Sequence, residues 1–341
     1  MTERPMVVVV LAALALLALG GCPKPVPPTP QGITGKDLAE RYLACGKDID
    51  AGQWDAFKKD CVVGEFTGHI ADLPQTQTGD QLVDFMKSMK SAFPDMKMQP
   101  QLVAVSGQDV FAVTLMTGTH DGALKFAGLP DVPATHKRIG TLFFQRQSFA
   151  DGKSEEWTFS DSSTFMGQLG LLSSEAGPTR PVVEQGWDGA PSVVVSAGEA
   201  REKANIEAAR KAVDAINAHK PGDAAAMVTD DVIESDQATG KDIKGKDEFL
   251  RDLEVLISTF PDVKLDIQNY WSAGDWVISI GTLRGTWKGP MGNFKPTGKT
   301  VSSVYADVIK VRDGKAAQIW RFRNGLAIAM QLGVVPGTGL K

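Results

Sequence analysis

The strongest constraint on this chain is that one pattern of residues occurs in it twice. Residues 91–97, SAFPDMK, recur as 258–264, STFPDVK, and Gly118-Thr119 recurs at the same offset as Gly285-Thr286. Further pairs keep the same order: Asp151-Gly152-Lys153 with Asp313-Gly314-Lys315, Trp157 with Trp320, and Gln168-Leu169-Gly170 with Gln331-Leu332-Gly333. Matches repeated in one order indicate two copies of one structural unit. We therefore expect two homologous domains, 34–172 and 199–338, joined by a linker rich in Gly, Pro and Ser at 173–198.

Each copy has the same predicted order of elements, with helices first and strands after them. In the first copy, apolar residues at helical spacing cover about 38–49 and 82–93, and extended segments follow from residue 96 to residue 161. Helices followed by a run of strands are typical of an α+β fold. The expected architecture is two tandem cone-shaped α+β barrels, each with a curved antiparallel sheet wrapped over helices around an interior pocket.

The N-terminus predicts where the protein lies in the cell. Residues 6–19 form an unbroken apolar run of 14 residues, shorter than the ~20 that a membrane-spanning helix needs but typical of a signal peptide. The ending Leu19-Gly20-Gly21-Cys22 resembles a bacterial lipobox, so we expect a lipoprotein signal peptide at 1–21 and lipidation of Cys22. The alternative is a plain signal peptide followed by an incidental cysteine.

The residues after Cys22 support an anchored protein. The stretch 22–33 is rich in proline and would form an extended tether. Position 23 is Pro rather than Asp, which by similarity to Gram-negative lipoproteins favours the outer membrane. The expected location is the bacterial cell envelope, facing the periplasm, with the lipid anchor as the one contact with the membrane.

Charge and cysteine usage exclude several function classes. A formal net charge of -5 does not suit a general nucleic-acid binder, which needs a basic surface. The cysteines and histidines lack metal-ligand spacing and no Gly-rich phosphate loop is present, so we expect no metal, no cofactor and no nucleic-acid partner. In an oxidising compartment, Cys45 and Cys61 form either one disulfide or two buried free thiols.

The repeated motifs carry a resemblance to a known family. The Phe-Pro-Asp turn, Gly-Thr-His with Gly122, the Asp-Gly-Lys hairpin, the Trp-x-x-x-Asp strand and the Gln-Leu-Gly ending together resemble the SnoaL-like (polyketide cyclase-like) family of the nuclear transport factor 2-like superfamily. The resemblance covers both copies and implies the cone fold. The family includes polyketide cyclases, which close a ring by intramolecular aldol condensation, and members with no established activity.

The resemblance implies a catalytic residue in domain 1. Cyclases of the family use an aspartate on the last long strand as general acid/base, and the spacing carries this role to Asp161. Trp157 and Phe159 alternate along the same strand, so they share a face with Asp161 and would raise its pKa. In the cyclases, polar residues on the neighbouring strand assist this aspartate. Gln145 and Gln147 occupy their positions here, where the cyclases tend to have a histidine at one of the two.

The second copy departs from this pattern. Asn324 stands where the aspartate should be, and it cannot accept a proton. Asp307 occupies the position of Gln145, and Trp287 that of His120. The remaining ligand-binding candidates are His120, Tyr305 and Trp320. The nearby Arg321 and Arg323 are expected to point to solvent.

Three functions are compatible with these residues. The favoured one is binding of a small, largely apolar molecule in one or both cone pockets. The second is a cofactor-independent cyclase or isomerase that uses Asp161. The third is a structural module whose sheet contacts the other domain or a second copy of the chain.

Overall fold

The computed structural model describes residues 33–125, 131–150, 152–172, 179–292 and 294–334. The expected signal peptide, the lipidation site Cys22 and all but the last residue of the proline-rich tether lie outside the described residues. Among the helices within the described ranges, none has both the length and the apolar character needed to cross a membrane.

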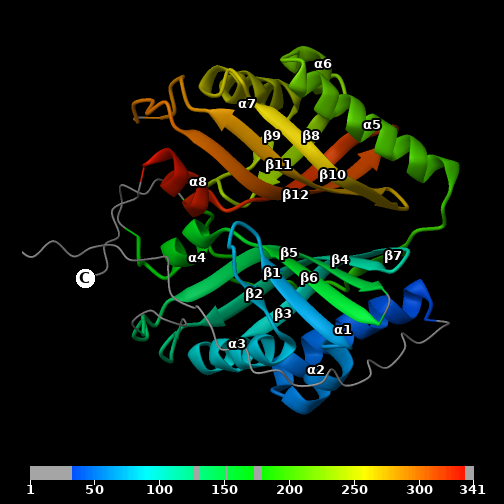
Figure 1. Cartoon of the computed structure of the whole chain (residues 1–341), viewed down its shortest axis with the longest axis vertical. Coiled ribbons are helices and arrows are strands. Elements are labelled where there is room, and N and C mark those ends of the chain that lie inside the picture. Colours follow the sequence, from blue (N-terminus) through cyan, green and yellow to red (C-terminus); the bar gives the residue numbers. More distant parts are fainter. Residues whose placement is uncertain (1–32, 126–130, 151, 173–178, 293, 335–341) are drawn as a thin grey trace, which may run out of the picture.

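Domain 1 begins with helices and continues with a seven-stranded sheet (Figure 1). The helices are α1 (Gly35–Ala51), α2 (Trp54–Cys61), α3 (Gly79–Ala92) and α4 (Ser162–Gln168). The strands are β1 (Glu65–Ile70), β2 (Thr76–Gln77), β3 (Lys97–Ser106), β4 (Asp109–Thr119), β5 (Arg138–Ala150), β6 (Lys153–Phe159) and β7 (Ser192–Val195). They lie in the order β2-β1-β6-β5-β4-β3-β7.

Local sequence explains where the first helices begin and end. The side chains of Thr34 and Thr78 each accept a hydrogen bond from the backbone N–H three residues later. In return, the side chains of Asp37 and Gln81 accept a hydrogen bond from the backbone N–H of Thr34 and Thr78, which makes a capping box at α1 and at α3. Helix α1 ends at Gly52, whose φ of 69° is open to glycine without steric cost.

Domain 2 repeats this arrangement with six strands. The helices are α5 (Ala200–Asn217), α6 (Pro221–Ala225), α7 (Lys246–Thr259) and α8 (Gly325–Leu332). The strands are β8 (Val228–Asp236), β9 (Ile243–Lys244), β10 (Lys264–Ala273), β11 (Trp276–Thr286), β12 (Thr300–Arg312) and β13 (Lys315–Phe322), in the order β10-β11-β12-β13-β8-β9.

The α+β fold and its two tandem copies are confirmed, and three details differ from expectation. Both sheets are mixed rather than antiparallel, since β1 pairs parallel with β6 and β8 pairs parallel with β13. Neither sheet closes into a barrel within the described residues, because each has two edge strands. Part of the segment expected to be a linker, Ser192–Val195, forms β7 and pairs parallel with β3.

The two sheets face each other, helices α1–α3 and α5–α7 cover their outer sides, and α4 and α8 lie next to each other where the two domains meet (Figure 1). Each sheet therefore has an inner face toward its own helices and an interdomain face toward the other sheet. One apolar cluster contains residues from both interdomain faces: Leu102, Phe111, Val113, Phe144 and Phe159 of domain 1 with Trp276, Ile278, Ile280, Val308 and Phe322 of domain 2. Asp72 adds polar contacts across this interface, since it accepts hydrogen bonds from Ser303 Oγ and the Val304 N–H.

Candidate functional site

A chain of hydrogen-bonded polar side chains crosses the inner face of domain 1. The Tyr42 hydroxyl on α1 lies 3.0 Å from Thr114 Oγ1 and donates to Gln145 Oε1 at 2.8 Å. Gln145 Nε2 donates to Thr158 Oγ1 at 3.3 Å, and Thr158 donates to Glu156 Oε1 at 3.3 Å. The sequence predicted Gln145 as a site residue but missed Glu156 and Tyr42.

Glu156 is the carboxyl group of this chain. It is buried, and its second oxygen accepts a hydrogen bond from Gln147 Nε2 at 2.7 Å. Burial raises the pKa of Glu156 above its ordinary value, and the hydrogen bonds from Gln147, Thr158 and Gln145 oppose that rise. The inner face of domain 1 thus holds a buried carboxyl group with a raised pKa.

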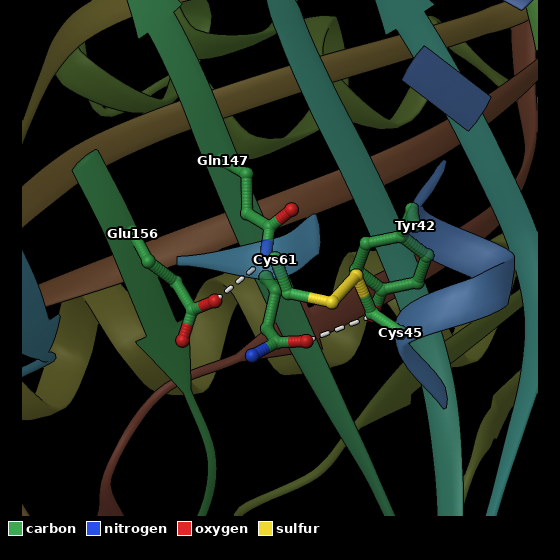
Figure 2. The surroundings of a disulfide bond; sticks show 6 residues. Tyr42, Cys45, Cys61, Gln147 and Glu156 are labelled. Atoms are coloured by element: carbon green, nitrogen blue, oxygen red, sulfur yellow. Dashed lines mark hydrogen bonds between the residues drawn. A yellow bond between two sulfur atoms is a disulfide. The ribbon is translucent and has the colours of Figure 1, made fainter. Parts of the chain in front are cut away.

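A disulfide closes the helical side of the same region (Figure 2). Cys45 of α1 and Cys61 of α2 are bonded, with their Cα atoms 5.9 Å apart, and Figure 2 shows Tyr42, Gln147 and Glu156 around the bridge. Of the two alternatives left open by the sequence, the structure has the bridge. It joins α1, which carries Tyr42, to α2.

The inner core of domain 1 contains five methionines, whereas Met291 is the one methionine of the described residues that packs against the inner core of domain 2. Met86, Met89 and Met96 belong to the buried cluster between helices and sheet, and Met98 and Met116 pack against it. At the repeat offset, the same five positions in domain 2 are Leu253, Leu256, Val263, Leu265 and Leu283, which all pack in the corresponding cluster. Unbranched methionine side chains adapt to ligands of different shapes, whereas Leu and Val pack in fewer rotamers.

His120 lies beside the methionine cluster with one unused donor. Its ring is fully buried and stacks on Phe93 at 5.1 Å. Nδ1 accepts a hydrogen bond from the Thr135 N–H at 3.2 Å, and burial lowers the pKa of the ring, so the neutral ring carries its proton on Nε2. Among the described residues, Nε2 has no hydrogen-bond partner.

Asp161 lies outside the inner face, which corrects its expected position. It is the N-cap of α4, where Oδ2 accepts from the Thr164 N–H at 2.6 Å, and Oδ1 accepts from the Gly325 N–H of domain 2 at 2.7 Å. Burial raises the pKa of Asp161, and these backbone hydrogen bonds oppose the shift. With both oxygens bonded to backbone, the carboxylate has the geometry of a structural cap.

Asn324 occupies the matching position in domain 2. Its Oδ1 accepts from the Ala327 N–H at the start of α8, and its Nδ2 donates to Ser162 Oγ of domain 1. Like Asp161, it caps a helix and ties the domains together.

Three of the predicted aromatic residues, Trp157, Phe159 and Trp320, also lie on the interdomain faces. Phe159 is fully buried in the cluster shared by the two sheets, and Trp157 and Trp320 pack against that cluster. Trp157 stacks on His69 at 4.3 Å, and Trp320 stacks on Trp276 at 5.3 Å. The alternation along β6 places these residues on one face as predicted, but this face points to the other domain.

The inner face of domain 2 is charged. Arg321 makes two hydrogen bonds with Asp307, at 2.9 and 3.0 Å, and a third with the buried Glu234 at 3.1 Å. Arg323 pairs with Asp236 at 2.5 Å. The expectation that both arginines point to solvent is wrong, because the carboxylates of β8 and β12 that pair with them were not recognised. Tyr305 is buried next to this group, with the Arg321 guanidinium 6.0 Å from its ring centre.

Burial raises the pKa of Glu234 to about 7, although the charge of Arg321 opposes the shift. Within the described residues, no three His, Cys, Asp or Glu side chains are placed to hold a metal ion.

Comparison with protein-family models shows which family the chain is related to. The model of the SnoaL-like polyketide cyclase family matches residues 36–169 and again residues 206–332, which together make up more than half of the chain. The chain belongs to this family. Both SnoaL-like domains carry the match, in agreement with the duplicated motifs. A search of the curated proteins finds no match.

Solved structures give similar folds for one SnoaL-like domain at a time. A candidate SnoaL-like polyketide cyclase from Jannaschia sp. CCS1 is 19% identical, with a TM-score of 0.38, over 40% of this chain and 97% of that one. IdmH, a candidate polyketide cyclase from Streptomyces antibioticus, is 20% identical with a TM-score of 0.34, over 38% of this chain and 99% of its own. An NTF2-like protein of unknown function from Burkholderia pseudomallei K96243 is 15% identical with a TM-score of 0.34, over 38% and 97%.

Proposed function

We propose that the protein is a lipid-anchored binding protein of the bacterial envelope that holds a small, largely apolar molecule in domain 1. The observation that carries this proposal is the set of five methionines on the inner side of domain 1, next to the unused Nε2–H of His120. A buried donor without a partner costs ~1–3 kcal/mol. A ligand with an apolar body and one acceptor oxygen would remove that cost.

Domain 2 has a supporting role in this proposal. Its inner core replaces each of the five methionines by Leu or Val, and the Arg321 guanidinium on its inner face is paired with Asp307 and Glu234. At the position of His120, Trp287 is buried and its Nε1 donates to the Gly289 carbonyl at 2.8 Å. The donor that is unused in domain 1 is satisfied in domain 2.

The test uses prodan, a neutral fluorescent naphthalene with a ketone acceptor, titrated into the full chain. We expect saturable binding with a blue-shifted emission. His120→Phe keeps an aromatic ring against Phe93 but removes the donor, so the affinity for prodan should fall about ten-fold, equal to ~1.4 kcal/mol. Trp287→Phe, the matched change in domain 2, should leave the affinity unchanged. Equal affinities in both variants and the wild type would contradict the proposal.

The envelope anchor has its own test. In the native host, the wild-type protein should sediment with the membrane fraction, and Cys22→Ser should move to the soluble fraction. Retention of Cys22→Ser in the membrane would contradict lipidation at this residue.

Glu156 favours a second candidate function, a cofactor-independent cyclase or isomerase. Such a reaction needs a carboxyl group of raised pKa next to a carbonyl ligand. Glu156 has the raised pKa and lies on the inner face, whereas Asp161 is held by backbone at the interdomain contact. If domain 1 catalyses proton abstraction, the protein will speed deuterium exchange at the α-carbon of prodan's propionyl group, and Glu156→Gln will abolish it. Exchange at the uncatalysed rate would favour binding alone.

A further inference from the structure

A cavity of about 280 Å³ lies between the domains, away from both inner faces. Its lining comes from β5 and β6 of domain 1 and from β10, β11 and β12 of domain 2: Arg146, Glu155, Trp157, Gln268, Asn269, Trp271, Ile280 and Val304. Neither domain could form it alone.

The charged groups of this cavity are already paired. Arg146 lies 2.9 Å from the Asp109 carboxylate, and its guanidinium stacks over Trp271 at 5.0 Å. Glu155 pairs with His69 Nε2 at 3.2 Å. An ionic ligand would have to compete with these partners, so the cavity suits a neutral molecule.

The lining is apolar in the middle and polar at the rim. Ile280 and Val304 contribute aliphatic surface, and Trp157 and Trp271 contribute one indole from each domain. The exposed side chains of Gln268 and Asn269 offer both donors and acceptors at the edge. A ring with C–H groups on its face and hydroxyl groups around its edge matches both parts of this lining.

The corresponding place on the other side of the molecule has different residues. At the repeat offsets, Val308 stands for Arg146, Gln318 for Glu155, Leu102 for Asn269 and Ala104 for Trp271. The other half of the interface between the domains keeps a tryptophan, Trp320, at the position of Trp157, but it has no indole at the position of Trp271 and neither of the two charged side chains.

We propose that this interdomain cavity is a second binding site, which takes a neutral polyhydroxylated ring such as one sugar unit. The site is independent of the apolar ligand proposed for the inner face of domain 1.

The test is an NMR titration of the ¹⁵N-labelled full chain with methyl β-glucoside, N-acetylglucosamine and cellobiose. At least one of the three should give saturable shifts of the Trp157 and Trp271 indole N–H signals, with no shift at Trp287. Asn269→Ala changes an exposed side chain, so it should fold normally and weaken this binding at least five-fold. Gln318→Ala, at the position equivalent to Glu155, should bind as the wild type does.

Two results would overturn the proposal. One is the absence of saturable shifts at Trp157 and Trp271 with all three sugars. The other is tighter binding of choline or indole than of any sugar at these two signals, which would assign the cavity to a cation or to a flat aromatic molecule.

Discussion

Asp161 and Asn324 occupy the same position in the two domains, and each caps a helix at the contact with the other domain. Asp and Asn are among the residues that cap helices best. Asp161 and Asn324 can therefore have the same structural role, although in the sequence the change from Asp to Asn suggests the loss of a catalytic acid/base. The resemblance implied a catalytic role for Asp161, but the sequence could not show that domain 2 supplies a backbone N–H donor to this carboxylate.

Replacing Asp161 should change stability rather than ligand binding. Asp161→Ala removes a cap and leaves the Thr164 and Gly325 N–H groups without their acceptor, so urea denaturation should show a loss of about 2 kcal/mol. Asp161→Asn keeps the cap and should lose about half as much. Prodan affinity should be unchanged in both variants. A stability of Asp161→Ala equal to wild type would rule out this structural role.

Glu234 should make stability depend on pH. Its pKa is about 7 in the folded chain, against an ordinary value of 4.5, so the folded state retains a proton that the unfolded state releases between these values. This contribution to stability is fully present below pH 4.5 and is lost as the pH rises through 7. The urea midpoint of the wild type should fall between about pH 5 and pH 8, and that of Glu234→Gln should fall less. Equal slopes in the two proteins would contradict the assignment.

At the scale of elements, β6 shows what the sequence could predict and what it could not. Period-two alternation correctly placed Trp157 and Phe159 on one face and left Glu156 on the other. Both faces of the strand are covered, one by helices and one by the second sheet, so hydrophobicity alone could not identify the inner face. Comparison of the two copies held a usable signal, because all five inner methionines of domain 1 change to Leu or Val.

The disulfide between α1 and α2 should stabilise domain 1 because it lowers the conformational entropy of the unfolded chain. Cys45 and Cys61 are 16 residues apart, and a closed loop of this size is worth about 3 kcal/mol in the chain-entropy account. Cys45→Ala/Cys61→Ala should lose about this amount in urea denaturation. As a control, dithiothreitol should lower the stability of the wild type and leave the double variant unchanged. A double variant as stable as the oxidised wild type would contradict the prediction.

At the scale of the whole molecule, the two domains form one hydrophobic interface between their sheets. Phe322 of domain 2 stacks on Phe144 of domain 1 at 5.7 Å, and both are fully buried. A domain separated from its partner would expose this apolar sheet face to water, which is unfavourable in proportion to its area.

Unfolding should therefore be cooperative across both domains. Scanning calorimetry of the wild type should show one transition. Phe322→Ala should cost about 3–5 kcal/mol and separate the transition into two, because it leaves a cavity in the shared cluster. Lys288→Ala, on the exposed surface, should leave the single transition in place. Two separate transitions in the wild type would show that the interface does not couple the domains.

The two domains share one fold but differ in the side chains of their inner cores. Domain 1 has five inner methionines and an imidazole N–H without a partner among the described residues, whereas domain 2 has Leu or Val at those five positions and Arg321 paired with carboxylates. We propose that this difference makes domain 1 the ligand-binding domain.

The most direct test is the methyl spectrum of the full chain labelled with [methyl-¹³C]methionine during titration with prodan. The signals of Met86, Met89, Met96, Met98 and Met116 should shift together and saturate at one equivalent of bound prodan, and Met227 and Met330 of domain 2 should not move. Saturable binding without shifts at the five methionines of domain 1, or with shifts at Met227 or Met330 instead, would contradict the claim.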